Sequence, residues 1–290
     1  MIPRLVQTQL RTMSQYNNLL TKGQMSTVTL FPEKHIKYNT YDELTIYIKG
    51  FVSRGEKAEN FKKWTDSHDI MVAKHKWGEL AKGWYWDCGQ IKYPYPLITT
   101  TGHALYSGTK LLRFNPVVLT TGIIFDIALF SSRLLYEYFH ADKNTVIYAT
   151  KLSEDLIRLS KKYKKLRVIS HSLGCKLLMN AIVKIPPEHR PTTIHMLAPA
   201  IVEEEYANVF NNLAKEKTYV YYCNDDIVLG TILQFIKSQN IVGASGLTNS
   251  YEGVEIKDVG EYFKDYWLVH NNYNINFSYF INPETPNRLF

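Results

Sequence analysis

Short strand-like segments alternate with helix-like segments through the second half of this 290-residue chain. Apolar, β-branched or aromatic runs predict strands over residues 166–170, 193–197, 218–222 and 254–258. Apolar residues at helical spacing predict helices over residues 173–184, 203–215 and 229–237. Such alternation favours a mostly parallel central sheet flanked by helices, so we expect an α/β fold.

The first half carries similar segments around one long interruption. We expect strands over residues 26–31, 44–49 and 83–88, and helices over residues 69–82 and 145–163. Residues 1–25 are expected to form an N-terminal arm, and residues 89–165 a long helical insertion before the strand at 166–170. No proline-rich linker divides the rest, so residues 26–290 are predicted to form a single domain.

The insertion is longer than one crossover needs. If 83–88 and 166–170 are neighbouring strands, a single helix could join them with far fewer residues than 89–165. Its apolar stretch, 117–130, is too short to span a bilayer, which needs about 20 residues. The stretch 104–138 either caps a functional site or covers a face of the sheet. An apolar cap would suit an acyl substrate.

Composition excludes several classes of protein. With 45% hydrophobic and 21% charged residues, the chain is not expected to be disordered. The first residues lack a continuous apolar segment, so no signal peptide is expected. Cys88, Cys175 and Cys223 form no CxxC motif. We therefore expect a cytoplasmic protein with neither a disulfide framework nor a zinc ribbon.

The charge gives little indication of a macromolecular partner. The net charge is +7, and the one dense basic run, residues 161–165, ends a predicted helix, where cations oppose the helix dipole. No nucleic-acid partner is therefore expected, while weak contact with anionic membrane surfaces stays open. No metal or nucleotide motif occurs, so no metal and no cofactor are expected. The sequence does not indicate an oligomeric state.

The segment with the most chemical content reads Ser-His-Ser-Leu-Gly over residues 170–174, between a predicted strand and a predicted helix. It matches the nucleophile elbow G-x-S-x-G, with Ser170 in place of the first glycine. The positions two before and two after the nucleophile must be small because the strand and the helix pack closely, and serine is small. Ser172 is therefore the predicted nucleophile. The alternative is a serine that only caps the helix.

This strand, elbow and helix resemble the lipase and esterase branch of the α/β-hydrolase superfamily. The resemblance extends over about residues 40–275 and implies the chain order nucleophile, acid, histidine. It implies Asp226 as the acid, since Asp-x-Val follows the strand at 218–222, with Asp225 as the close alternative. One or both aspartates could instead cap the next helix. His270 is the implied base, because it alone of the nine histidines follows the acid.

The resemblance also implies an oxyanion hole made by two backbone N–H groups. One belongs to Leu173, directly after the nucleophile, and the other to Phe51, after an early strand. Gly50 lets the backbone come close there. Lys49 departs from the family, which commonly has histidine before this glycine.

The implied activity is that of a serine esterase or lipase-like hydrolase. It would cleave a carboxylic ester, with small-molecule esters and lipids as candidate substrates, through a catalytic triad and an acyl-enzyme. Thioester and amide substrates stay open. The alternative is a catalytically silent α/β-hydrolase fold that serves as a binding or interaction protein.

Overall fold

The computed structural model describes residues 27–29, 42–51, 53, 57–89, 135–233, 239–264, 266 and 268–281. The predicted arm at 1–25, the apolar stretch at 117–130 and the candidate cap before residue 135 lie outside these residues. Among the helices that the structure describes, none is long and apolar enough to cross a membrane.

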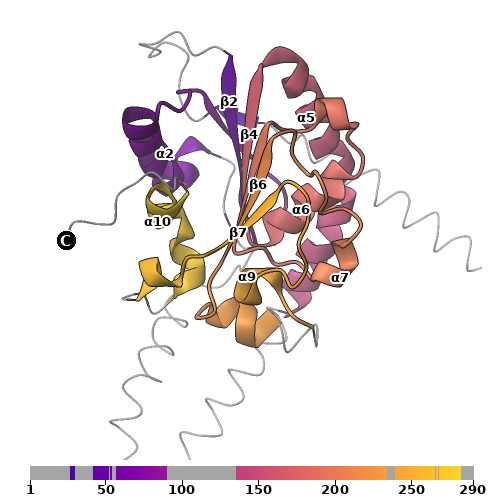
Figure 1. The fold of residues 1–290 in the computed structure, drawn as a ribbon, viewed down its shortest axis with the longest axis vertical. Coiled ribbons are helices and arrows are strands. Elements are labelled where there is room, and N and C mark those ends of the chain that lie inside the picture. Colours follow the sequence, from indigo (N-terminus) through magenta and orange to yellow (C-terminus); the bar gives the residue numbers. More distant parts are fainter. Residues whose placement is uncertain are drawn as a thin grey trace, which may run out of the picture.

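One sheet runs through the centre of the molecule (Figure 1). Its strands are β1 (Thr27–Thr29), β2 (Glu43–Ile48), β3 (Ala81–Trp84), β4 (Lys165–His171), β5 (Thr193–Leu197), β6 (Lys217–Tyr222) and β7 (Val254–Asp258). They lie in the order β1-β3-β2-β4-β5-β6-β7. β1 is antiparallel to β3, whereas the six strands from β2 to β7 are parallel. The expected α/β class, a parallel central sheet flanked by helices, is confirmed.

β2 lies between β3 and β4. The premise that the strands before and after the insertion are neighbours is therefore wrong. Thr45 pairs with Ala81 of β3 on one side and with Arg167 of β4 on the other. The strands expected at 83–88 and 166–170 are therefore not neighbours. Five of the six β2 residues are buried, as expected for a strand with a sheet neighbour on each side.

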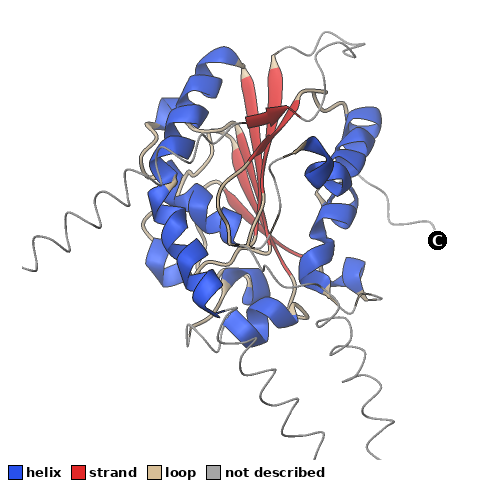
Figure 2. Ribbon diagram, turned by 180° about the vertical axis from the view of Figure 1, so that it is seen from behind, coloured by secondary structure: helices blue, strands red, loops and turns tan. Residues whose placement is uncertain are grey.

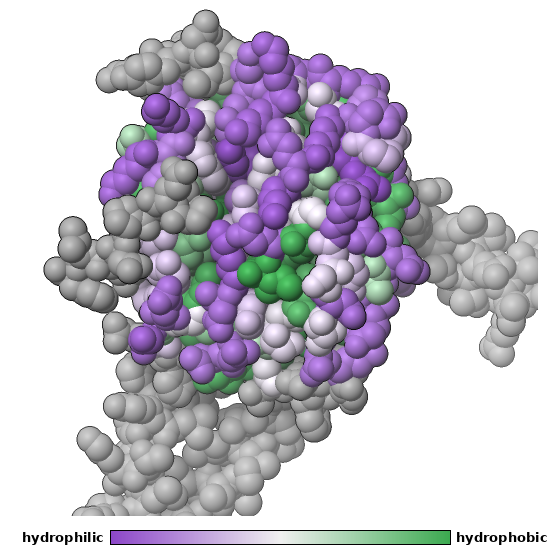
Figure 3. Space-filling model, viewed as in Figure 1, coloured by the Kyte–Doolittle hydropathy of each residue, from purple (hydrophilic) through white to green (hydrophobic). Residues whose placement is uncertain are grey.

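Helices cover both faces of the sheet (Figure 2). On one face lie α2 (Lys62–His75) and α10 (Tyr273–Phe280), which contact each other. On the other lie α5 (Ala149–Lys162) and α6 (Leu173–Ile182), preceded in the chain by a helix over residues 135–147. The short helices α7 (Glu203–Tyr206) and α9 (Val242–Ser245) follow β5 and β6. The outer surface in the view of Figure 3 is mostly hydrophilic, with small hydrophobic patches.

Two predicted helices end earlier than their apolar spacing suggested. α2 stops at His75 because Lys76 takes the left-handed conformation (φ 55°) and donates its N–H back to Met71 O. Trp77 thus lies outside the helix, although it continues the helical spacing. α7 ends at Tyr206, and the positive φ of Asn212 (54°) interrupts the segment expected to be helical up to residue 215.

Two further helices differ in kind from the expectation. The helix predicted over 145–163 is divided by a turn at Tyr148, so that α5 starts at Ala149. The one predicted over 229–237 is a π-helical segment, η4 (Val228–Leu233), and residues 234–238 lie outside the described part.

Candidate active site

Ser172, Asp226 and His270 come from three loops at one edge of the sheet. Ser172 directly follows β4, Asp226 follows β6, and His270 lies in the short helix η6 (Val269–Asn272) after β7. Because these strands are parallel, their carboxyl ends share one edge, where α/β proteins place their ligands. The topology therefore brings together side chains that are far apart in sequence.

Ser172 has a backbone conformation that few non-glycine residues adopt, with φ 55° and ψ −127°. Three hydrogen bonds hold it. Its N–H donates to Leu197 O at 2.9 Å, and its carbonyl accepts from the N–H groups of Cys175 at 3.0 Å and Ala200 at 3.2 Å. The Ser172 side chain makes no capping hydrogen bond to α6, so the capping interpretation is wrong.

Two glycines permit the turn after β2 to pack directly against this elbow. A Cβ on Gly174 would lie 2.5 Å from Lys49 O. One on Gly50 would lie 2.6 Å from the Ser172 Cβ atom and 2.7 Å from His171 O. Ser170 fits the position of the missing glycine, where it is buried and donates a hydrogen bond to the Cys175 Sγ atom at 3.2 Å.

The His270 imidazole joins the other two predicted residues. Its Nε2 atom lies 2.8 Å from Ser172 Oγ, and its Nδ1 atom lies 2.7 Å from Asp226 Oδ2. A carboxylate can only accept hydrogen bonds, so Nδ1 carries the proton and Nε2 is left to accept the Ser172 hydroxyl. This arrangement can remove a proton from Ser172.

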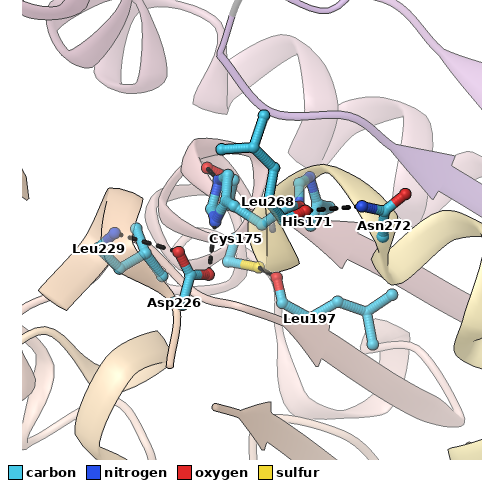
Figure 4. A network of polar contacts seen from close by, with 9 residues as sticks. His171, Cys175, Leu197, Asp226, Leu229, Leu268 and Asn272 are labelled. Atoms are coloured by element: carbon cyan, nitrogen blue, oxygen red, sulfur yellow. Dashed lines mark hydrogen bonds and ion pairs between the residues drawn. The ribbon is translucent and has the colours of Figure 1, made fainter. Parts of the chain in front are cut away.

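Asp226, and not Asp225, contacts the histidine. Asp226 is fully buried, and its other oxygen, Oδ1, accepts the backbone N–H of Leu229 at 3.2 Å (Figure 4). Asp225 is exposed on the adjoining turn. The sequence left two roles open for these aspartates, contact with the histidine and capping of the next helix. Asp226 has both roles: it contacts His270 and also caps the segment that follows.

The predicted oxyanion donors directly follow Ser172 and Gly50 in the chain. Leu173 is the first residue of α6, and the first N–H groups of a helix have no acceptor inside it. Phe51 follows Gly50 at the close approach described above, and its ring packs edge-on against Tyr138, with 5.6 Å between ring centroids.

Lys49 stands where the superfamily that the sequence resembles commonly has histidine. Its side chain contacts the segment that leads into α2. Its Nζ atom donates to Asn60 O at 2.5 Å and lies 4.5 Å from the centre of the Phe61 ring. Its backbone carbonyl accepts the Trp86 indole N–H at 2.8 Å. These contacts fix the turn that carries Gly50 and Phe51.

The three cysteines are buried free thiols. Burial raises the pKa of the Cys88 and Cys175 thiols to about 12 and that of Cys223 to about 11, so all three stay protonated at neutral pH. Within the described ranges, no group of three or more His, Cys, Asp or Glu side chains could hold a metal ion.

His171, for which no sequence motif indicates a role, also lies at the site. Its Nε2 atom lies 2.9 Å from the backbone carbonyl of His270, and the two rings are 4.8 Å apart. The only signal in the sequence was its position next to Ser172.

No protein-family model matches this chain, and no match was found among curated proteins.

Proposed function

We propose that this protein is a serine hydrolase of the α/β-hydrolase superfamily that cleaves a carboxylic ester. The observation that carries the proposal is the His270 imidazole, hydrogen-bonded at once to Ser172 Oγ at 2.8 Å and to Asp226 Oδ2 at 2.7 Å. The conformation of Ser172 at the turn from β4 to α6 supports it, as does the chain order nucleophile, acid, histidine.

In the first half of the reaction, Ser172 Oγ attacks the carbonyl carbon of the ester while its proton passes to His270 Nε2. Asp226 holds the other nitrogen and stabilises the imidazolium that forms. His270 then gives the proton to the leaving alcohol, and the acyl group remains on Ser172. In the second half, His270 takes a proton from water as the water attacks the acyl-enzyme, and it then returns that proton to Ser172 Oγ, which leaves as the acid is released.

The tetrahedral intermediates carry a negative oxygen that needs hydrogen-bond donors. The Leu173 N–H lies at the positive end of the α6 dipole, and the Phe51 N–H is the proposed second donor. Removing one such donor from a serine hydrolase typically costs about 10²–10³-fold in turnover.

Apolar side chains beside the triad support an acyl substrate. Ile227, directly after Asp226, is 54% exposed, and Leu268, two residues before His270, is 43% exposed. Such side chains could bury the hydrocarbon part of an ester or lipid. A small-molecule ester with an apolar acyl group is therefore the proposed substrate class.

A fluorophosphonate probe tests the proposal, because it reacts covalently with activated serines. The intact protein should be labelled, with the modified peptide mapped to Ser172, and it should hydrolyse p-nitrophenyl esters. Ser172→Ala should abolish both signals. Ser160→Ala, which removes a hydroxyl that bonds to Ile157 O within α5, should keep them. A wild-type protein that neither labels nor turns over any ester would instead favour the binding-protein alternative.

A further inference from the structure

His171 lies where the ends of three elements meet. It is the last residue of β4, directly before Ser172. Its ring packs against Trp64 of α2, with 6.1 Å between centroids, and against Tyr273 of α10, with 5.8 Å. The same ring lies 4.8 Å from that of His270. It is thus held from several sides.

One hydrogen bond connects this fixed ring to the loop that carries His270. The His171 Nε2 atom lies 2.9 Å from His270 O, and a carbonyl can only accept, so Nε2–H is the donor. His270 is therefore held at three atoms: Nδ1 by Asp226, Nε2 by Ser172 and its backbone carbonyl by His171. The side-chain bonds orient the imidazole, whereas the third fixes the backbone from which it projects.

We propose that His171 is a positioning residue, which holds the backbone of His270 so that its imidazole reaches Ser172 and Asp226 together. This inference rests on the proposed hydrolase function. Placement errors of about 1 Å at a reacting group can cost on the order of 10²-fold in rate. A single bond to the backbone of the proton carrier can therefore matter for turnover without touching the substrate.

The charge state of His171 fits this role. Burial lowers the pKa of His171 well below its usual value, and the nearby Lys49 ammonium acts in the same direction. The ring is thus neutral at physiological pH. A cation at this place would oppose the positive charge that His270 gains when it takes the Ser172 proton.

The competing explanation is that His171 only fills space between α2 and α10. Two substitutions separate the two roles. His171→Phe keeps an aromatic ring against Trp64 and Tyr273 but removes the donor. His171→Gln removes the ring but keeps an N–H donor, on a side chain long enough for it to approach His270 O.

We expect His171→Phe to lower kcat by about 10–100-fold with KM little changed, since substrate contacts remain. His171→Gln should retain most of the turnover. Thermal unfolding of each variant gives its folded fraction, and kcat is calculated per folded molecule.

His195→Gln is the matched control. His195 is buried on the neighbouring strand β5, and its ring stacks on Tyr219 at 5.0 Å and lies 5.8 Å from Trp77. It should lose stability but keep the kcat of its folded fraction. Normal turnover in His171→Phe, or equal loss in the Phe and Gln variants, would overturn the positioning role.

A crystal structure of His171→Phe decides the matter independently of activity. We expect the His270 imidazole to leave Ser172 Oγ or Asp226 Oδ2. If it keeps both contacts, His171 does not position it, even if the wild-type protein is an active esterase. Conversely, a wild-type protein that refuses fluorophosphonate refutes the hydrolase proposal, while the displacement of His270 still tests the role of His171.

Discussion

Two neighbouring aspartates differ completely in their surroundings. Asp226 is fully buried against His270, whereas Asp225 is exposed on the turn. Burial strengthens the interaction of a carboxylate with an imidazolium, because little water screens it. Of this pair, only Asp226 is therefore placed to stabilise a positive charge on His270, as the proposed mechanism requires.

Replacing each aspartate by asparagine tests this difference. Asp226→Asn should lower kcat on the order of 10⁴-fold, because an amide no longer fixes the tautomer of His270. Asp225→Asn should keep wild-type turnover, because Asp225 lies in water. Steady-state kinetics on one p-nitrophenyl ester measures both. Equal effects of the two substitutions would contradict the assignment.

Substitutions of Ser172 and His270 should have non-additive effects on turnover. Either single alanine substitution is expected to remove up to about 10⁶-fold of the turnover, and the double substitution little more, because the proton transfer needs both side chains. Single-turnover assays of the three variants give the coupling between them. Losses that multiply in the double variant would speak against a direct Ser172–His270 partnership.

At the level of helices and loops, close packing of backbone sets the shape of the elbow. A Cβ on Gly174 would meet Lys49 O at 2.5 Å and Ile48 O at 2.9 Å. Both are backbone atoms of the central sheet and its following turn, so α6 would have to shift to make room. The position of Leu173 would shift with it.

Gly174→Ala should therefore destabilise the fold by about 1–3 kcal/mol through overpacking and also lower turnover. Gly230→Ala is the control, since among the described residues its Cβ would meet only Ala244 Cβ, at an ordinary 3.7 Å. That substitution should be neutral or stabilise the fold by up to about 1 kcal/mol. Urea unfolding compares the two. A Gly174→Ala protein as stable and active as wild type would refute the close packing.

A buried carboxylate at the start of α7, that of Glu203, binds the loop that precedes β7. The Glu203 oxygens accept from the backbone N–H and the hydroxyl of Thr248, both at 2.7 Å, from Asn249, and from Tyr251 OH at 2.8 Å. Burial alone would raise the pKa of Glu203, but these donors outweigh it and lower that pKa from 4.5 to about 2.

Because the folded pKa is lowered, Glu203 stabilises the fold fully above about pH 4.5, and this contribution is lost as the pH falls towards 2. Glu203→Gln should cost about 2 kcal/mol at pH 7 and make stability less dependent on pH in this window. Denaturant unfolding between pH 3 and 7 measures the effect. The idea fails if wild type and variant lose stability in parallel on acidification.

The complete sheet brings the proposed catalytic residues together. Ser172 and Asp226 are 98 and 44 positions from His270 in sequence, and the three residues meet because β4 to β7 all end at one edge. The exposed Ile227 and Leu268 belong to the same loops as Asp226 and His270. Under the proposed function, these two side chains are the candidates for contact with an acyl chain on Ser172.

We expect kcat/KM for p-nitrophenyl esters to rise with acyl length, by up to about 0.8 kcal/mol or roughly fourfold for each CH₂, until the apolar surface is covered. The Ile227→Ser, Leu268→Ser double variant should flatten this rise. Val183→Ser, equally exposed (54%) but at the far end of α6, should not. A maximum at acetyl would exclude a long-chain substrate while leaving esterase activity intact.

Local pattern predicted much of the fold. The strands at 193–197 and 254–258 have the predicted bounds, and the strand, elbow and helix around Ser172 differ by at most two residues at their ends. By contrast, the expected helix at 203–215 is one short turn, α7. Apolar spacing records which side chains face the core, but not where a backbone turn interrupts the helix. That the chain is one domain stays a prediction.

The sequence by itself determined the α/β class and singled out Ser172, because the periodicities and the small residues of the elbow act over a few neighbouring positions. Tertiary structure alone decided between Asp226 and Asp225, placed β2 between β3 and β4, and joined His171 to His270 across 99 positions. The reason is physical. Burial and hydrogen bonding between distant loops depend on the assembled sheet, whereas the local Asp-x-Val pattern favoured Asp226 without excluding the adjacent Asp225.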